Sequence, residues 1–166
     1  METKTLLTDR EKNKLVELSK DKIVLEIGTY HGGSAKAMVD AGAKQVITID
    51  SRLPANDLNE QIENISISLT NLRGKAIMIT GYSHEVIKLL KKESVDMVFI
   101  DGSHEYVDVK QDYFNVLDIV KSDGIICFHD YEDVWPGVKY FIDSEFKDLK
   151  DKMEFVDSLA VIKLGV

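Results

Sequence analysis

Short apolar runs alternate with amphipathic stretches along this chain from Lys22 onward. The runs are rich in β-branched residues, and we expect them to be strands. Near-continuous apolar strands are typical of sheets buried on both faces, and their alternation with helices predicts a mostly parallel sheet with right-handed crossovers. The pattern predicts an α/β, doubly wound fold with the strands Ile23–Ile27, Val46–Ile49, Ala76–Ile79, Val95–Ile100 and Gly124–Phe128.

The segments between these strands carry apolar positions at helical spacing. Asn56–Arg73 fits a helix ended by Gly74, although Ile65–Leu69 within it also alternates like a strand. We favour the helix there. The other helical faces are expected at Ala35–Ala41, Val86–Leu90 and Tyr106–Val120.

Both ends of the chain carry signals of their own. Thr8-Asp9-Arg10-Glu11 has the form of a capping box and predicts a helix within residues 1–20. We expect this helix to cover one edge of the sheet and to serve packing, not chemistry. Trp135-Pro136-Gly137 predicts the start of a last helix that ends near Asp148.

Two apolar runs near the C-terminus, Phe155–Val156 and Leu159–Leu164, flank the pair Asp157-Ser158. A two-residue connection permits only an antiparallel pairing of the strands that it joins. The sequence therefore predicts a closing β-hairpin.

Composition narrows the class of protein. At 166 residues, of which 44% are hydrophobic, the chain suits one compact domain over 1–166. A net charge of −8 with scattered Lys and Arg argues against nucleic acid as a partner. No apolar run approaches the roughly 20 residues of a membrane span, and the polar N-terminus has no signal-peptide pattern. Cys127, the single cysteine, lies in an apolar run and is expected in the core. We expect a soluble, cytoplasmic protein.

The most specific motif is Glu26-Ile27-Gly28-Thr29-Tyr30-His31-Gly32-Gly33-Ser34, at the end of the first predicted strand. A buried strand that feeds a glycine turn into a helix N-terminus places backbone N–H groups where nucleotide-like ligands bind. Asp50 ends the next strand, and an acid at that place suits the hydroxyls of a ribose. The turn and the acid together predict a cofactor site.

Tyr30 narrows the choice of cofactor. The dinucleotide fingerprint G-x-G-x-x-G needs a second glycine so that the backbone can approach a pyrophosphate, and that position here is Tyr30. S-adenosylmethionine has a ribose and an adenine but no phosphate, and its amino-acid end can use the N–H groups of the turn and Ser34. The motif therefore favours a methyl donor over NAD.

Polar residues gather just beyond the predicted strand ends. The acids Asp50, Asp101 and Asp130 lie at the edge where open α/β sheets bind ligands. All four histidines of the chain fall at that edge as well: His31, His84, His104 and His129. Each alone is most simply a loop residue, but their coincidence favours a functional site.

Two neighbouring strand ends carry most of the candidate chemistry. Asp101 and Asp130 could chelate a divalent cation such as Mg²⁺, which would lower the proton affinity of an acceptor hydroxyl. Histidine titrates near neutral pH, so His104 is a candidate general base. A turn or helix N-cap role is the alternative for Asp101.

Further residues are expected to border the ligands. Gly81-Tyr82-Ser83-His84 follows the third strand, with Ser83 as a helix cap and Tyr82 or His84 beside an adenine. Tyr131 and Trp135 follow the fifth strand and are candidates for the wall of an acceptor pocket, although Trp135 also suits the core.

From residue 20 to residue 146 these motifs resemble those of class I S-adenosylmethionine-dependent methyltransferases, and more narrowly a small bacterial group related to catechol-type and cephalosporin-hydroxylase-type enzymes. The resemblance implies that the glycine turn holds the methionine end of the cofactor, that Asp50 binds the ribose and that Gly81 to His84 border the adenine. The expected cofactor-binding residues are Glu26, Gly28, Thr29, Tyr30, Gly32, Ser34, Asp50, Ser51, Gly81, Tyr82, Ser83 and Asp101.

In catechol-type relatives the carboxylates that match Asp101 and Asp130 bind magnesium, and a lysine that matches His104 removes the acceptor proton. This chain departs from that pattern twice, because His104 replaces the lysine and Tyr131 replaces an asparagine that is a third metal ligand. The resemblance implies Asp101 and Asp130 as metal ligands, and His104 with Asp101 as catalytic residues.

We expect methyl transfer by in-line displacement to a hydroxyl of a small molecule. Two alternatives stay open: an NAD-dependent oxidoreductase with the same strand, turn and acid, and a non-catalytic module that binds a nucleoside cofactor. The segments where relatives build acceptor pockets are short here, so the acceptor site is expected to be open or completed by another subunit of a homo-oligomer.

Overall fold

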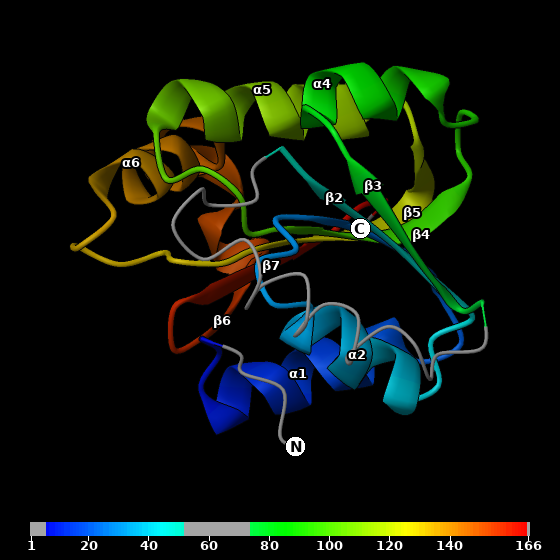
Figure 1. Ribbon diagram of the computed structural model, residues 1–166. Helices are drawn as coiled ribbons and strands as arrows, with labels where there is room; N and C mark the ends of the chain where they lie inside the picture. Colours follow the sequence, from blue (N-terminus) through cyan, green and yellow to red (C-terminus); the bar gives the residue numbers. More distant parts are fainter. Residues whose placement is uncertain (1–5, 52–73, 166) are drawn as a thin grey trace, which may run out of the picture.

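The computed structural model describes residues 6–51 and 74–165, and this part of the chain forms a seven-stranded sheet in the order β3-β2-β1-β4-β5-β7-β6 (Figure 1). β1 to β5 are parallel, while β7 pairs antiparallel with both β5 and β6. The predicted doubly wound sheet and its closing hairpin are confirmed. The strands are β1 (Ile23–Ile27), β2 (Gln45–Asp50), β3 (Ala76–Thr80), β4 (Val95–Ile100), β5 (Val120–Phe128), β6 (Glu154–Val156) and β7 (Leu159–Lys163).

Helices cover both faces of the sheet. α1 and α2 lie on one face, and α4, α5 and α6 lie on the other (Figure 1). None of the described helices is both long enough and apolar enough to cross a membrane. The helices are α1 (Asp9–Ser19), α2 (Gly33–Asp40), α4 (Ser83–Val86), α5 (Tyr106–Val116) and α6 (Pro136–Glu145), with 3₁₀ turns at Ile87–Leu89 and Lys147–Lys152.

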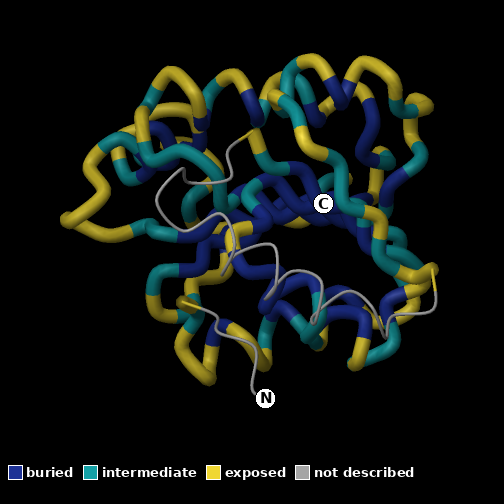
Figure 2. The backbone as a smooth tube through the Cα atoms, in the orientation of Figure 1, coloured by how far each residue is buried: buried dark blue, intermediate teal, exposed yellow. Residues whose placement is uncertain are grey.

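The core has two halves because successive strand residues point to opposite faces. In β4, Val98 and Ile100 join the apolar cluster under α5 and α6, whereas Met97 and Phe99 join the cluster under α1 and α2. Figure 2 shows the sheet as the buried centre of the molecule. Cys127 is fully buried in the second cluster, as expected.

Three details differ from the sequence prediction or fall outside the described residues. α5 ends at Val116, and Val120 starts β5, where it pairs with Val95 ahead of a register irregularity. α1 covers a face of the sheet and not its edge, since Leu15 packs in the cluster of Met97 and Phe99. The helix expected over residues 56–73 lies outside the described residues.

The capping box at the start of α1 is confirmed. The Thr8 hydroxyl accepts a hydrogen bond from the backbone N–H of Glu11, and the Thr8 N–H donates to the Glu11 carboxylate at 2.8 Å. These two bonds satisfy N–H groups that the helix start would otherwise leave unpaired. They also fix the place of the Glu11 carboxylate.

Gly28, directly after β1, lets two strand ends approach closely. Its φ is +99°, and a Cβ atom built there would lie 1.9 Å from the carbonyl oxygen of Asp101. The N–H of Asp101 in turn donates to the Ile27 carbonyl at 2.8 Å. A side chain at position 28 would therefore force the ends of β1 and β4 apart.

We expect Gly28→Ala to lower the free energy of unfolding by at least about 3 kcal/mol, because it adds a backbone clash to an unfavourable φ. Gly42→Ala is the matched control, since Gly42 has φ +105° but its Cβ would meet only the Lys20 side chain at 3.9 Å. Gly42→Ala should lower the free energy of unfolding by about 1–2 kcal/mol. Urea denaturation measures the stability of both variants. Equal losses of unfolding free energy would contradict the importance of the close approach between Gly28 and the Asp101 carbonyl.

Candidate active site

A cavity of about 850 Å³ opens at the carboxyl edge of the parallel strands. Its volume is in the range of pockets that enclose a cofactor-sized molecule. Eight of the expected cofactor-binding residues line it: Gly28, Tyr30, Asp50, Ser51, Gly81, Tyr82, Ser83 and Asp101. His104, His84 and Trp135 line it too.

The glycine turn is held in shape by Asp50. One oxygen of its carboxylate accepts hydrogen bonds from the backbone N–H groups of Thr29 at 3.0 Å and Tyr30 at 2.9 Å. Tyr30 has φ +45°, which a residue of this size adopts only where neighbouring contacts hold it. Asp50 thus supports the turn from the end of β2 while it also lines the cavity.

Glu26 lies under the turn and does not line the cavity. It is fully buried and accepts hydrogen bonds from the hydroxyls of Ser34 and Thr48. Burial raises the pKa of Glu26 to about 8, against the opposing effect of these two bonds. Thr29 completes the cluster through its hydroxyl, 2.6 Å from that of Thr48. Direct cofactor contacts of Glu26, Thr29, Gly32 and Ser34 stay a prediction, since the cavity is bounded by other residues of the turn.

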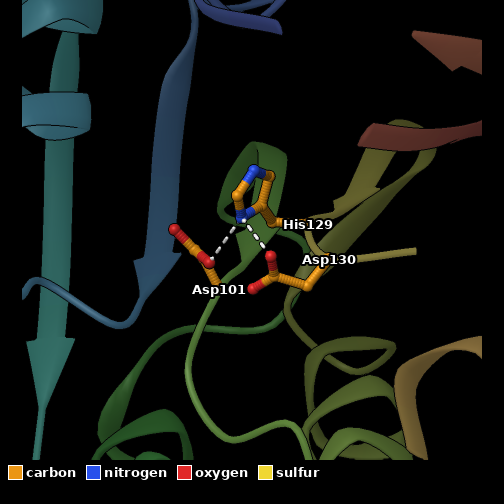
Figure 3. A group of neighbouring side chains, drawn as sticks. All are labelled: Asp101, His129 and Asp130. Carbon is orange, nitrogen blue, oxygen red and sulfur yellow. Dashed lines mark hydrogen bonds and ion pairs between the residues drawn. The ribbon is translucent and has the colours of Figure 1, made fainter. Parts of the chain in front are cut away.

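Asp101, His129 and Asp130 form a compact cluster at the ends of β4 and β5 (Figure 3). Nδ1 of His129 lies 3.1 Å from an oxygen of Asp101 and 3.3 Å from an oxygen of Asp130. Asp130 has φ +61°, a left-handed conformation that turns the chain so that its carboxylate meets the ring. The structure therefore brings the two expected metal ligands together around an imidazole.

The charges of this cluster depend on each other. Burial lowers the pKa of His129, but its contacts with Asp101 and Asp130 outweigh burial and raise that pKa to about 11. Burial raises the pKa of Asp101, with the His129 contact acting against it. Burial also acts to raise the pKa of Asp130, yet His104 and His129 hold it well below its usual range. His129 is thus a cation at neutral pH, and Asp130 is an anion.

His104 stands between the cluster and the cavity. Its Nε2 lies 2.8 Å from the second oxygen of Asp130, and its ring stacks on Trp135 with centroids 3.9 Å apart. A carboxylate next to Nε2 favours the tautomer with the proton on that atom, which leaves Nδ1 able to accept one. His104 therefore has the surroundings of an oriented base.

Aromatic and acidic residues also line the cavity. Tyr82 and His84 stack on each other with centroids 5.6 Å apart, which fits their expected place beside an adenine. Ser83 is not the cap of α4, since Tyr82 holds that position and the Ser83 hydroxyl donates to Asp112. Burial raises the pKa of Asp112 to about 6.

Tyr131 does not wall the cavity. Its hydroxyl donates to Asp143 at 2.9 Å and its ring packs on Phe155, with centroids 5.0 Å apart. His31 is buried and also lies outside the cavity lining. Of the two aromatic residues expected at an acceptor pocket, only Trp135 is placed there.

Sequence reasoning missed the roles of three buried residues. The sequence indicates His129 only as one histidine among four, yet it is the centre of the acidic cluster. Glu11 was expected only to pack, and its carboxylate lies 3.5 Å from Nε2 of His129. Asp112 lines the cavity from α5. Alternation along β5 could have indicated His129, because Cys127 and His129 must point to the same face.

The cluster satisfies the spacing that one metal ion requires. A donor atom from each of Asp101, His129 and Asp130 lies within 4.8 Å of the others. Mg²⁺ prefers oxygen ligands, whereas two carboxylates with an imidazole suit first-row transition ions such as Mn²⁺. The three donor atoms therefore lie close enough together to fit one divalent cation, and His129 would be the third ligand beside the two expected carboxylates.

Solved structures share this fold. The O-methyltransferase TomG from Streptomyces achromogenes, in complex with SAM, superposes with a TM-score of 0.70 at 15% identity, covering 96% of this chain and 82% of that one. An O-methyltransferase from Bacillus cereus in complex with SAH gives 0.67 at 15% identity, covering 95% and 82%. At these identities the likeness shows the Rossmann-like methyltransferase fold.

Sequence comparison goes further than the fold. An uncharacterized protein of Acanthamoeba polyphaga mimivirus is 31% identical over 119 residues, which cover 68% of this chain. The match spans 53% of that relative, so about half of its length. The model of the family described as "Methyltransferase domain" matches residues 25–131, which run from β1 through the end of the acidic cluster. The chain therefore belongs to the methyltransferase domain family, as its motifs predicted.

Proposed function

We propose that this protein binds S-adenosylmethionine in the cavity and transfers its methyl group to a hydroxyl of a small-molecule acceptor. The observation that carries the proposal is that residues of the glycine turn, Asp50 and His104 all line one cavity. A donor and an acceptor can be held side by side there, and positioning two bound reactants is the main source of rate in such a displacement. The SAM and SAH bound by the TomG and Bacillus cereus enzymes support the choice of donor.

The transfer forms a carbon–oxygen bond and breaks the carbon–sulfur bond of the sulfonium. The electron pair of the broken bond stays on sulfur, so the donor leaves as S-adenosylhomocysteine. The acceptor's proton goes to Nδ1 of His104, while Asp130 holds Nε2 of the same ring at 2.8 Å. Trp135 stacks on that ring and provides an apolar surface for the acceptor.

A divalent cation is a separate part of the proposal. Asp101, His129 and Asp130 would hold it, and it would take the place of the proton on Nδ1 of His129. When bound, such an ion lowers the proton affinity of an acceptor hydroxyl. The proton route to His104 uses only the protein's own side chains and does not depend on the ion.

Tyr30 is the observation that favours this donor over NAD. Its backbone is part of the turn, and it lines the cavity at the position where the dinucleotide fingerprint requires a glycine. We also propose a reducing cytoplasmic location, which the buried free Cys127 supports. The net charge of −8 supports a small acceptor over a large anionic one.

Wild-type protein should bind S-adenosylhomocysteine and not NADH in isothermal titration calorimetry. Asp50→Ala should weaken that binding, because a charged hydrogen bond to a ribose hydroxyl contributes about 1.5–3 kcal/mol. The loss corresponds to at least about tenfold in the dissociation constant. The matched control is Asp40→Ala, which removes an acid that is ion-paired with Lys36 on the surface of α2.

Asp50 supports the glycine turn and is proposed to bind the ribose. Asp50→Asn separates these two functions, because the amide oxygen can still accept hydrogen bonds from the turn while the negative charge is lost. Binding of NADH without S-adenosylhomocysteine would replace the proposal by the oxidoreductase alternative. Tight binding of the donor product with no turnover on any hydroxyl acceptor would support the non-catalytic alternative.

His104→Ala should retain S-adenosylhomocysteine binding and lose turnover by about 10²–10⁴-fold, the usual contribution of a positioned base. Transfer of a labelled methyl group to a panel of small hydroxyl compounds measures the rate. His104→Gln keeps a hydrogen bond to Asp130 but cannot accept the proton, so it should be equally slow. Near-normal turnover in either variant would remove His104 as the base.

Titration calorimetry with MnCl₂ and with MgCl₂ tests the ion directly. We expect Mn²⁺ to bind more tightly than Mg²⁺, since an imidazole is part of the donor set. Asp130→Asn should weaken Mn²⁺ binding, while Asp40→Ala should leave it unchanged. Absence of binding of either ion at millimolar concentration would remove the cation from the proposal and leave the base in place.

A further inference from the structure

Glu11 is a charged residue that lies behind the site and does not line the cavity. It is 1% exposed, although it belongs to a helix on the surface of the sheet. One carboxylate oxygen accepts from the N–H of Ser158 at 2.8 Å and from its hydroxyl at 2.6 Å. The other accepts from the Thr8 N–H at 2.8 Å and lies 3.5 Å from Nε2 of His129. A buried carboxylate with this many partners has a fixed position.

The alternation of β5 explains why Glu11 and His129 meet. Cys127 packs in the cluster under α1 and α2, and His129, two residues further, points to the same face. The His129 ring is 6% exposed and lies edge-on to Phe99 of the same cluster. Its two nitrogens therefore face opposite directions, with Nε2 toward α1 and Nδ1 toward the site.

A continuous chain of contacts runs from Glu11 to the candidate base. Nδ1 of His129 contacts both Asp101 and Asp130, as Figure 3 shows. Asp130 then contacts Nε2 of His104 at 2.8 Å. The orientation of the His129 ring thus decides where both carboxylates lie, and Asp130 decides how His104 is presented to the cavity.

Glu11 is also charged. Its carboxylate accepts hydrogen bonds from the N–H and hydroxyl of Ser158 and from the N–H of Thr8, and such bonds favour the charged form. A carboxylate on one side of His129 and two on the other hold the ring between them. Replacing Glu11 by a neutral residue would leave the His129 ring attracted only by Asp101 and Asp130.

A second path joins Glu11 to the same loop. The N–H of Tyr131 donates to the carbonyl of Ser158 at 2.9 Å, and Ser158 is held by Glu11. The loop that carries His129 and Asp130 is therefore fixed at its far end by the β6–β7 turn. Both paths begin at one carboxylate on α1.

We propose that Glu11 is a positioning residue of the active site, which orients the His129 ring and through it the carboxylates of Asp101 and Asp130 and the imidazole of His104. The catalytic consequence rests on the proposed function, whereas the orientation itself does not. Glu11 touches neither the cavity nor His104, so its effect is indirect.

Glu11→Gln tests the inference. The amide oxygen can still accept from Ser158, but the amide NH₂ would then face the Thr8 N–H and Nε2 of His129, both of which are donors. In protein labelled with ¹³C,¹⁵N-histidine, we expect the ring resonances of His129 and His104 to shift at one fixed pH. His129→Gln assigns the His129 signals. We also expect kcat to fall by on the order of 10- to 100-fold with a smaller change in the KM for the donor, as for a displaced catalytic group.

Ser158→Ala is the matched control. It removes the hydroxyl contact at 2.6 Å from the same carboxylate and leaves the contact with His129. If Glu11 only stabilised the fold, Glu11→Gln and Ser158→Ala would lose similar amounts of unfolding free energy. The ring resonances of His129 and His104 would then not shift in either variant. Unmoved His129 signals in Glu11→Gln, or equal shifts in Ser158→Ala, would overturn the proposal.

Should Glu11→Gln fail to fold, Glu11→Asp gives the same comparison, because it retains the charge and withdraws the carboxylate from His129 by one methylene. The ring resonances need neither donor nor acceptor. A wild-type protein that binds no S-adenosylhomocysteine and transfers no methyl group would therefore contradict the proposed function, while the spectra would still decide the role of Glu11.

Discussion

The close approach of Gly28 to Asp101 is the constraint on which the site depends. The Asp101 carbonyl occupies the space where any other residue at position 28 would place its Cβ. The two strand ends are joined further by the bond from the Asp101 N–H to Ile27, and Gly28 donates to Ile49 on the other side. The glycine turn, the end of β2 and the end of β4 are thus one backbone unit. The glycine turn, Asp50 and Asp101 all line the cavity, and these backbone contacts hold them in one frame.

Electrostatic balance is the second requirement, because several carboxylates share a small, partly buried space. Asp101 and Asp130 would repel each other if they met alone, and burial would favour their neutral forms. The His129 ring between them supplies a compensating charge, and Glu11 balances that ring from the opposite side. The cost of removing each charge from water is offset by at least one contact with a neighbour. This is why the cluster behaves as a unit and not as separate residues.

The fold could be predicted from the sequence because its signals are local. Apolar runs identified the parallel strands to within two residues at most ends, and Asp157-Ser158 identified the hairpin. Val120 was wrongly assigned to a helix because a β-branched residue at helical spacing fits both patterns, and only its pairing with Val95 decides. The sequence places the glycine turn, Asp50, Asp101 and His104 at one edge of the sheet, because each lies at or just beyond a strand end. Glu11 and His129 are 118 positions apart, and no local pattern reports a contact between a helix cap and a strand end.

The start of α1 and the β6–β7 turn meet behind this site, and that arrangement links folding to the geometry of the site. Thr8 and Arg10 contact Asp157 while Glu11 contacts Ser158, across 147 to 149 positions of sequence. The loop after β5 then bonds to Ser158 through Tyr131. The carboxylates at the ends of β4 and β5 are therefore supported only once the hairpin has added to the sheet and α1 has docked on its face. Trp135 and Asp112 reach the cavity from the opposite helical layer. The geometry of the site therefore depends on the packing of both helical layers and of the β6–β7 turn against the sheet.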